Sequence, residues 1–237
     1  MSFLFIRLNP IKLSPIFEKY MSKPSKFFER QEERDALVNE YLIPNGIHDP
    51  KVIDAFRIVP RHALVGTKAQ DEAYQDYPLS IGLQQTISQP LVVAKMTQGL
   101  GIEKGMKILE IGTGSGYQAA ILQELGAEVY TVEILALLSF QAQKNLQLLG
   151  YTNIHFHIGD GYYGWPSMAP FDGILLTAAP DQIPKPLIQQ LRNNRKLILP
   201  LGKETQQLME VRKEGDNFHW DNLGPVSFVG MVGRVDS

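Results

Sequence analysis

The most informative segment of this chain reads Lys107-Ile108-Leu109-Glu110-Ile111-Gly112-Thr113-Gly114-Ser115-Gly116-Tyr117. Its first five residues are mostly apolar, as in a buried strand, and the residues from Tyr117 onward have the composition of a helix. A glycine-rich turn between a strand and a helix lets the backbone approach a ligand closely and directs free N–H groups toward it. The segment therefore predicts a ligand site within an α/β fold.

Short apolar segments alternate with helical ones around this turn. We expect strands over 107–111, 128–132, 154–158, 173–177, 196–199, 208–212 and 225–232, an extended segment over 78–87, and helices over 31–42, 50–57, 90–100, 117–125 and 135–149. Such alternation is typical of a mostly parallel sheet with helices on both faces. We therefore predict one Rossmann-like α/β domain over residues 31–237, with an N-terminal helical part. An irregular extension over residues 1–30, interrupted by prolines, is expected to precede it.

The spacing of the glycines separates two kinds of cofactor. A dinucleotide site reads G-x-G-x-x-G, whereas Gly112, Gly114 and Gly116 occupy every second position. The tighter spacing suits a cofactor that has no pyrophosphate, such as S-adenosylmethionine (SAM), and disfavours a nucleotide-dependent oxidoreductase. Taken alone, a turn of this kind also occurs without any ligand.

Acidic residues accompany the turn and the strands that follow. Glu110 lies in the strand just before Gly112 and is our candidate partner for the ammonium group of the methionine part of SAM. Glu133 ends the second strand about 20 residues beyond Gly112, where an acidic residue accepts ribose hydroxyls in nucleotide-binding α/β folds. Asp160, followed by Gly161, comes after the third strand, and we expect its carboxylate to reach the adenine amino group. Each residue alone could be an ordinary turn or strand end, but together they predict a SAM site.

Composition narrows the class of protein further. The chain has 23 basic and 25 acidic residues and a formal charge of −2, which argues against a dedicated nucleic-acid binder. There is no cysteine, so thiolate metal sites are excluded, and we expect no metal. No apolar run approaches the roughly 20 residues that span a bilayer.

The first 26 residues carry five basic residues against Glu18 alone, so a targeting peptide is an alternative to the frayed tail that we favour. We expect a cytoplasmic monomer with no membrane partner.

The segment Gly82-Leu83-Gln84-Gln85-Thr86-Ile87-Ser88-Gln89-Pro90 lies upstream of the glycine turn and mixes hydroxyl and amide side chains. On its own it fits a connection between a strand and a helix. In that interpretation Ser88 caps the helix that begins at Pro90.

Thr86-Ile87-Ser88-Gln89-Pro90 also resembles the Thr-Ile-Ser-x-Pro signature that precedes the SAM turn in the protein-L-isoaspartate O-methyltransferases. Other segments similar to this family are Val59-Pro60-Arg61, Ala73-Tyr74, Pro78-Leu79-Ser80-Ile81-Gly82, the stretch from Leu109 to Tyr117, Gly159-Asp160-Gly161, Gly164-Trp165-Pro166, Thr177-Ala178-Ala179-Pro180 and Leu199-Pro200-Leu201-Gly202. The resemblance covers about residues 45 to 232.

The resemblance implies a class I SAM-dependent methyltransferase that acts on the α-carboxylate of L-isoaspartyl residues in damaged peptides and proteins. The resulting ester cyclises to a succinimide, which initiates repair. The resemblance assigns to the cofactor Gln85, Thr86 and Ile87, and to the substrate Thr86, Ser88, Thr177 and Ala178. Ser88 is the candidate catalytic residue, as a donor to the substrate carboxylate. A carboxylate with a pKa near 4 is ionised at about pH 7, so the reaction needs no general base.

The chain departs from the family pattern at three places, namely Gln84, Ile134 and Asn193-Asn194-Arg195, where glycine, arginine and a Pro-Gly-Gly turn are usual. Two alternatives stay open at this point. The protein could methylate another carboxylate-bearing small molecule, or an RNA if a basic face were present. It could also be a module that binds SAM without catalysis.

Overall fold

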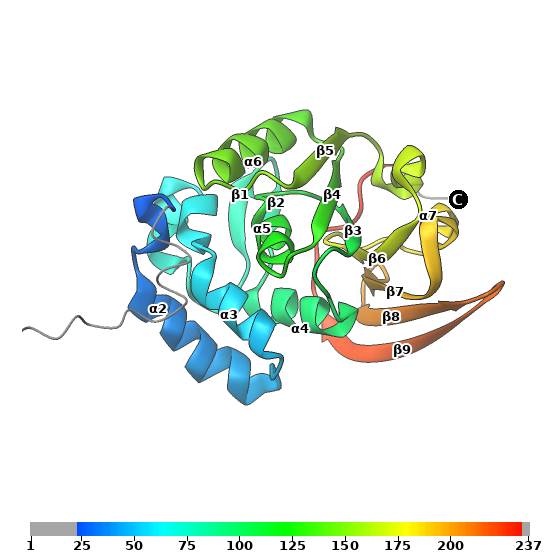
Figure 1. The fold of residues 1–237 in the computed structure, drawn as a ribbon, viewed down its shortest axis with the longest axis horizontal. Coiled ribbons are helices and arrows are strands. Elements are labelled where there is room, and N and C mark those ends of the chain that lie inside the picture. Colours follow the sequence, from blue (N-terminus) through cyan, green and yellow to red (C-terminus); the bar gives the residue numbers. More distant parts are fainter. Residues whose placement is uncertain (1–22, 234–237) are drawn as a thin grey trace, which may run out of the picture.

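The computed structural model describes residues 23–233, and its centre is a seven-stranded sheet in the order β5-β4-β3-β6-β7-β8-β9 (Figure 1). The strands are β3 (Lys107–Ile111), β4 (Glu128–Glu133), β5 (Ile154–Ile158), β6 (Phe171–Leu176), β7 (Leu191–Leu201), β8 (Gln206–Glu214) and β9 (Asn217–Val226). Strands β3 to β7 run parallel to one another, and β8 and β9 join one edge as antiparallel strands. The predicted mostly parallel sheet is confirmed.

Helices lie on both faces of this sheet. They are α2 (Gln31–Ala36), α3 (Pro50–Ile58), α4 (Pro90–Leu100), α5 (Tyr117–Glu124), α6 (Ala136–Leu148) and α7 (Lys185–Gln190). Ile108 of β3 lies in the core that α3, α4 and α5 cover, while its neighbour Leu109 lies in a second core that includes Leu187 of α7. Successive residues of a strand point to opposite faces, so both faces of the central strands are buried, as expected for parallel strands.

Shorter helical turns connect these elements. They are the 3₁₀ turns η1 (Ser25–Phe27), η3 (Ile43–Asn45), η4 (Arg61–Leu64), η5 (Thr67–Glu72), η6 (Gly161–Tyr163) and η7 (Pro166–Met168), and the π-helix η2 (Leu37–Leu42). The helix predicted over 31–42 is therefore continuous, but its second half is wound as a π-helix. No helix among residues 23–233 is long and apolar enough to cross a membrane.

The N-terminal residues that the structure describes pack on the domain. Phe27 is 5% exposed, and its ring centroid lies 5.9 Å from that of Tyr151. The Lys23 ammonium lies 3.7 Å from the Glu124 carboxylate of α5. The irregular extension expected over residues 1–30 therefore has two parts. Residues 1–22 lie outside the described residues, whereas residues 23–30 contact the body of the domain.

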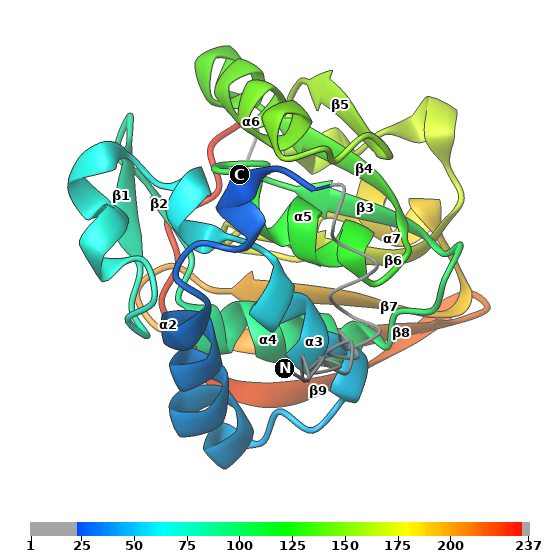
Figure 2. The ribbon, with the colours of Figure 1, turned by 60° about the vertical axis from the view of Figure 1, so that its left-hand side comes forward.

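A separate hairpin stands apart from the main sheet (Figure 2). Its strands are β1 (Leu79–Gly82) and β2 (Gln85–Ile87), which pair antiparallel. Leu83 and Gln84 form the turn with φ angles of 52° and 60°. Two left-handed central residues are characteristic of the tight hairpin turns that match strand twist. The extended segment expected over 78–87 is therefore folded back on itself.

The C-terminal strand expected over 225–232 is misplaced. The edge strand β9 ends at Val226. Most of its residues are solvent-exposed, and an exposed strand does not need the apolar pattern on which the prediction relied. The chain then leaves the sheet and crosses the strand ends, where it appears in red in Figure 1. Two backbone bonds hold it there, from Ala179 N to Val229 O at 2.9 Å and from Met231 N to Ala179 O at 2.8 Å. The short helix α7, which has Pro186 in its first turn, was not predicted from the sequence.

Candidate active site

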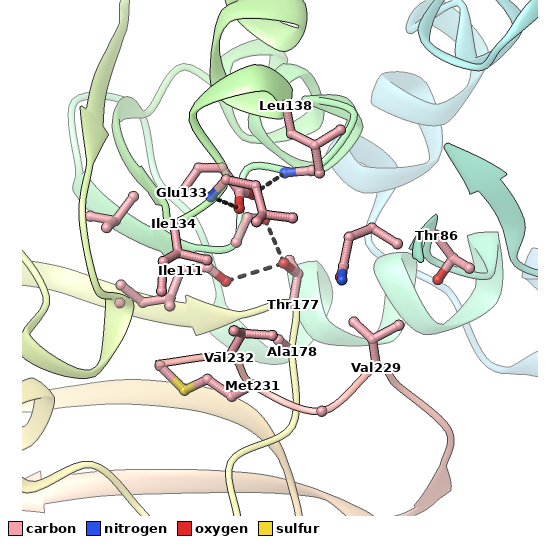
Figure 3. Close-up of a pocket in the computed structure, with 17 residues that line it drawn as sticks. Thr86, Ile111, Glu133, Ile134, Leu138, Thr177, Ala178, Val229, Met231 and Val232 are labelled. Carbon is pink, nitrogen blue, oxygen red and sulfur yellow. Dashed lines mark hydrogen bonds between the residues drawn. The ribbon is translucent and has the colours of Figure 1, made fainter. Parts of the chain in front are cut away.

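The site lies at the carboxyl ends of β3, β4 and β6. Strand β3 is flanked by β4 on one side and β6 on the other, so the chain order reverses at β3. In open α/β sheets, ligands bind outside the carboxyl ends of the strands at such a reversal. Residues that end or follow these three strands surround a hollow of about 570 Å³ (Figure 3).

The glycine turn serves the fold as well as the site. Gly112 has a φ of 95°, and a Cβ there would lie 2.4 Å from Thr177 Oγ1, so no side chain fits. Thr177 Oγ1 instead donates to Gly112 O at 2.5 Å, which ties β6 to the turn. Gly116 has a φ of 84°, and a Cβ there would lie 2.6 Å from Leu146 Cδ1 of α6. Gly112 and Gly114 line the hollow, whereas Gly116 packs α5 against α6 and does not line it.

Glu110 is fully buried beneath the turn and only partly satisfied. It lies opposite Thr131 in the parallel register of β3 and β4, and Thr131 Oγ1 donates to Glu110 Oε2 at 2.6 Å. Since that hydroxyl has one proton, the Thr113 hydroxyl, 2.6 Å away, donates in turn to Thr131. Glu110 Oε1 has no hydrogen-bond partner in the structure.

Burial raises the pKa of the Glu110 carboxyl to about 8, the hydrogen bond from Thr131 opposes this shift, and the charge of Glu133 adds to it. A buried polar atom without a partner costs free energy. A cationic donor delivered to Oε1 would remove that cost and lower the pKa.

Glu133 ends β4 and lines the large hollow, where Figure 3 shows it near Leu138 of α6. Its Oε2 accepts from Gly114 N at 2.9 Å and its Oε1 accepts from Leu135 N at 3.0 Å. These two bonds hold the carboxylate in place, and the Glu133 residue is 6% exposed. Each carboxylate oxygen has further lone pairs, so two hydroxyl donors can still be accepted.

A second hollow, of about 290 Å³, lies on the other side of the turn. It shares Thr86, Gly112, Gly114 and Thr177 with the first, so the two hollows adjoin. Both Ser88 and Glu110 line it. The structure thus brings together a hydroxyl donor and a buried carboxyl that are far apart in the sequence.

Ser88 is not the cap of α4, so that interpretation is wrong. The N-cap position belongs to Gln89, whose side chain makes no capping bond. Instead the Asp76 carboxylate accepts from the first free N–H of the helix, that of Leu91, at 2.9 Å.

The structure brings most of the predicted site residues to the two hollows. Those that line the large hollow are Gln85, Thr86, Gly112, Gly114, Glu133, Gly161, Thr177 and Ala178, and those that line the smaller one include Thr86, Ile87, Ser88, Glu110 and Thr177. Asp160 lines neither hollow. Its Oδ1 accepts from Tyr162 N at 2.9 Å and caps η6, and the chain at Gly233 lies against its carboxylate. Contact of Asp160 with adenine stays a prediction.

Sequence reasoning missed the apolar side of the large hollow. Val229, Met231 and Val232 of the C-terminal segment face it, together with Ile134 and Leu138 (Figure 3). Ile134 had been noticed only as a departure from the family pattern. The C-terminal residues carried no signal because their place depends on pairing with Ala179, far away in the sequence. No cluster of three or more histidine, aspartate or glutamate side chains within residues 23–233 could hold a metal ion.

The sheet order, the glycine turn and the acidic residues around it define the Rossmann-like class I SAM-dependent methyltransferase fold. More specifically, this chain belongs to the family described as protein-L-isoaspartate(D-aspartate) O-methyltransferase (PCMT), whose model matches residues 32–236. The resemblance inferred from the sequence motifs is confirmed.

Several individual proteins are similar over most of the chain. The protein-L-isoaspartate O-methyltransferase of Gloeobacter violaceus is 52% identical over 198 residues, which cover 83% of this chain and 97% of that protein. Protein-L-isoaspartate O-methyltransferase 1 of Syntrophobacter fumaroxidans is 47% identical and covers 86% of this chain and 96% of its own length. A solved structure of the Plasmodium falciparum protein, described as a putative PCMT in complex with S-adenosyl-L-homocysteine, superposes with a TM-score of 0.72 at 25% identity, covering 84% of this chain and 98% of that one.

Proposed function

We propose that this protein transfers the methyl group of SAM to the α-carboxylate of L-isoaspartyl residues in damaged proteins. Family membership and the residues around the two hollows support the proposal. The observation that carries it is that Glu110 and Ser88 line the same hollow. Glu110 offers an acceptor for a cation, and Ser88 offers a donor for an anion.

The residues present fit SAM. The unpaired Glu110 Oε1 suits the ammonium of its methionine part, and the Glu133 carboxylate suits the ribose hydroxyls. The apolar side chains of Ile134, Leu138 and Met231 suit the flat face of a purine ring. When bound, SAM supplies an activated methyl group on a sulfonium, so that the carboxylate oxygen gains the methyl as the carbon–sulfur bond breaks and both charges disappear.

The chain's own contribution is to orient the substrate and exclude water. No histidine among residues 23–233 lines either hollow, and an ionised carboxylate needs no base. The Ser88 hydroxyl, with Thr86 nearby, donates to the substrate carboxylate and aims one of its oxygens. Alignment of this kind can account for several kcal/mol of barrier reduction. Val229 and Val232 line the large hollow and replace water beside the bound molecules.

The partners follow from the same chemistry. The substrates are isoaspartyl peptides and proteins, and the near balance of charge in the whole chain gives no basic excess for nucleic acid. We propose that the protein acts as a cytoplasmic monomer, which size-exclusion chromatography with light scattering and microscopy of a tagged chain would test.

One assay tests the reaction directly. The protein is incubated with methyl-labelled SAM and two peptides of identical sequence, one with L-isoaspartate and one with aspartate at the same position. We expect label in the isoaspartyl peptide alone. Equal labelling of both peptides would show a carboxyl methyltransferase of another specificity, and SAM binding without labelling would show a binding module.

A further inference from the structure

The turn that carries Ser88 is held by a residue outside both hollows. Helix α4 begins at Pro90, and the first free N–H in it belongs to Leu91. The N–H groups of a first helical turn have no partner within the helix. Asp76 Oδ1 accepts from Leu91 N at 2.9 Å, so a carboxylate from a preceding loop supplies the cap.

The other oxygen of the same carboxylate holds the residue next to Ser88. Asp76 Oδ2 accepts from Gln89 Nε2 at 2.8 Å. Hydrogen bonds to an ionised acceptor are stronger than those between neutral groups. The carboxylate is also attracted by the guanidinium of Arg61, which is fully buried.

Ser88 is fixed on its other side by the hairpin. Ile87 is 3% exposed and pairs with Leu79 across β1 and β2. The backbone on either side of Ser88 is therefore anchored, by core packing before it and by Asp76 after it. Ser88 itself lines the smaller hollow.

We propose that Asp76 is a positioning residue for methyl transfer, which holds the turn from Ser88 to Leu91 so that the Ser88 hydroxyl faces the substrate carboxylate. The inference rests on the proposed role of Ser88. Asp76 lines neither hollow and so acts through Ser88 rather than on the substrate. A donor displaced by about 1 Å can lose up to a hundredfold in rate.

The test compares Asp76→Ala, Asp76→Asn and Ser88→Ala with the double variant Asp76→Ala/Ser88→Ala. Asp71→Ala is the matched control, because it removes a carboxylate of η5, a few residues before Asp76, that makes no hydrogen bond to α4 within the described residues. We expect Asp76→Ala to lower kcat/KM for the isoaspartyl peptide about ten- to hundredfold. Affinity for S-adenosylhomocysteine should change by less than about threefold, since the residues assigned to the cofactor keep their places.

Two results distinguish positioning from mere capping. Asp76→Asn should recover most of the activity, because its amide oxygen can accept from Leu91 N and its amide can pair with that of Gln89. The double variant should be no slower than Ser88→Ala, since a residue that acts through Ser88 has no effect once the hydroxyl is absent. If Asp76→Ala is poorly folded, Gln89→Ala removes one bond to the carboxylate and keeps the cap on Leu91, and it should show a smaller loss of the same kind.

The outcomes separate the two proposals. Normal kcat/KM in Ser88→Ala would overturn the role of Ser88 and the inference with it. A slow Ser88→Ala beside an Asp76→Ala that melts earlier but turns over normally per folded molecule would overturn the role of Asp76 alone. If the fold losses in kcat/KM of the two single variants multiply in the double variant, Asp76 acts independently of Ser88, and the inference would also be overturned.

Discussion

The buried carboxyl of Glu110 should make cofactor binding depend on pH. Its pKa is raised to about 8 by burial, its Oε1 has no hydrogen-bond partner, and the residue lines the smaller hollow. In the free protein near neutrality this group is mostly protonated, whereas an ammonium partner requires the carboxylate. Binding of the cofactor must therefore release a proton.

The size of the effect follows from the pKa. With a pKa of about 8, the carboxylate fraction is about 1% at pH 6.0 and about 24% at pH 7.5. The affinity for SAM should therefore rise about 20- to 30-fold over this interval. Glu110→Gln cannot ionise, so its affinity should be independent of pH and about ten- to hundredfold below wild type at pH 7.5, because a charge-assisted bond is lost.

Calorimetry in two buffers of different ionisation enthalpy measures both the affinity and the protons released. We expect about one proton per SAM in wild type at pH 6.5 and none in Glu110→Gln. Glu128→Gln, the same change at the first residue of β4 and away from both hollows, should behave as wild type. Affinity that does not change with pH in the wild-type protein, with no buffer dependence of the enthalpy, would refute the pairing of Glu110 with the ammonium.

The same carboxyl gives a stability readout with a defined sign. Its pKa is raised in the folded protein above the ordinary value of 4.5, so the folded state binds the proton more tightly than the unfolded chain. Without ligand, its contribution to stability is full below about pH 4.5 and is lost as the pH rises through about 8. Glu110→Gln should therefore gain stability relative to wild type between pH 6 and pH 8, as measured by urea unfolding at both pH values.

Four further predictions concern other parts of the molecule. Glu133→Ala should weaken SAM binding about ten- to hundredfold with the fold intact, and unchanged affinity by calorimetry would remove Glu133 from the site. Ser88→Ala should lower kcat/KM for the isoaspartyl peptide by a similar factor, and Ser88→Asp should be slower still because it opposes an anionic substrate; normal turnover in Ser88→Asp would contradict the donor role. Removal of residues 1–22 should leave folding and activity nearly unchanged, whereas removal through residue 27 should lower the melting temperature because Phe27 is buried, and equal melting temperatures would show that Phe27 contributes little. Gln84→Gly should stabilise the protein by up to about 1 kcal/mol, because Gln84 has a φ of 60° in the hairpin turn, and a lower melting temperature would show that its side chain contributes more than the backbone strain costs.

Local patterns in the sequence were sufficient for the sheet and for much of the cofactor site. The alternation of short apolar segments with helices located β3, β4 and β5 closely, because side-chain periodicity and burial are expressed within a few neighbouring residues. The turn from Gly112 to Gly116 and Glu133 at the end of β4 could be placed in the same way. Carboxyl ends of parallel strands meet at one edge of the sheet, so these residues had to come together.

Other features depended on contacts between residues far apart in the chain. The hairpin turn at Leu83 and Gln84, the exposed strand β9 and the segment from Val229 to Val232 have no distinctive local pattern. The last of these forms one side of the large hollow only because it pairs with Ala179.

The chemistry of the site also belongs to the tertiary structure. The sequence identified Glu110 and Ser88 as candidates, and family resemblance suggested their roles. Only the folded chain buries Glu110 beside Thr131 with one oxygen unpaired, and only the folded chain gives the cap of α4 to Asp76 and leaves Ser88 to the hollow. A residue type and its neighbours in sequence determine which bonds a side chain can make, but burial and the choice among those bonds depend on what packs against it.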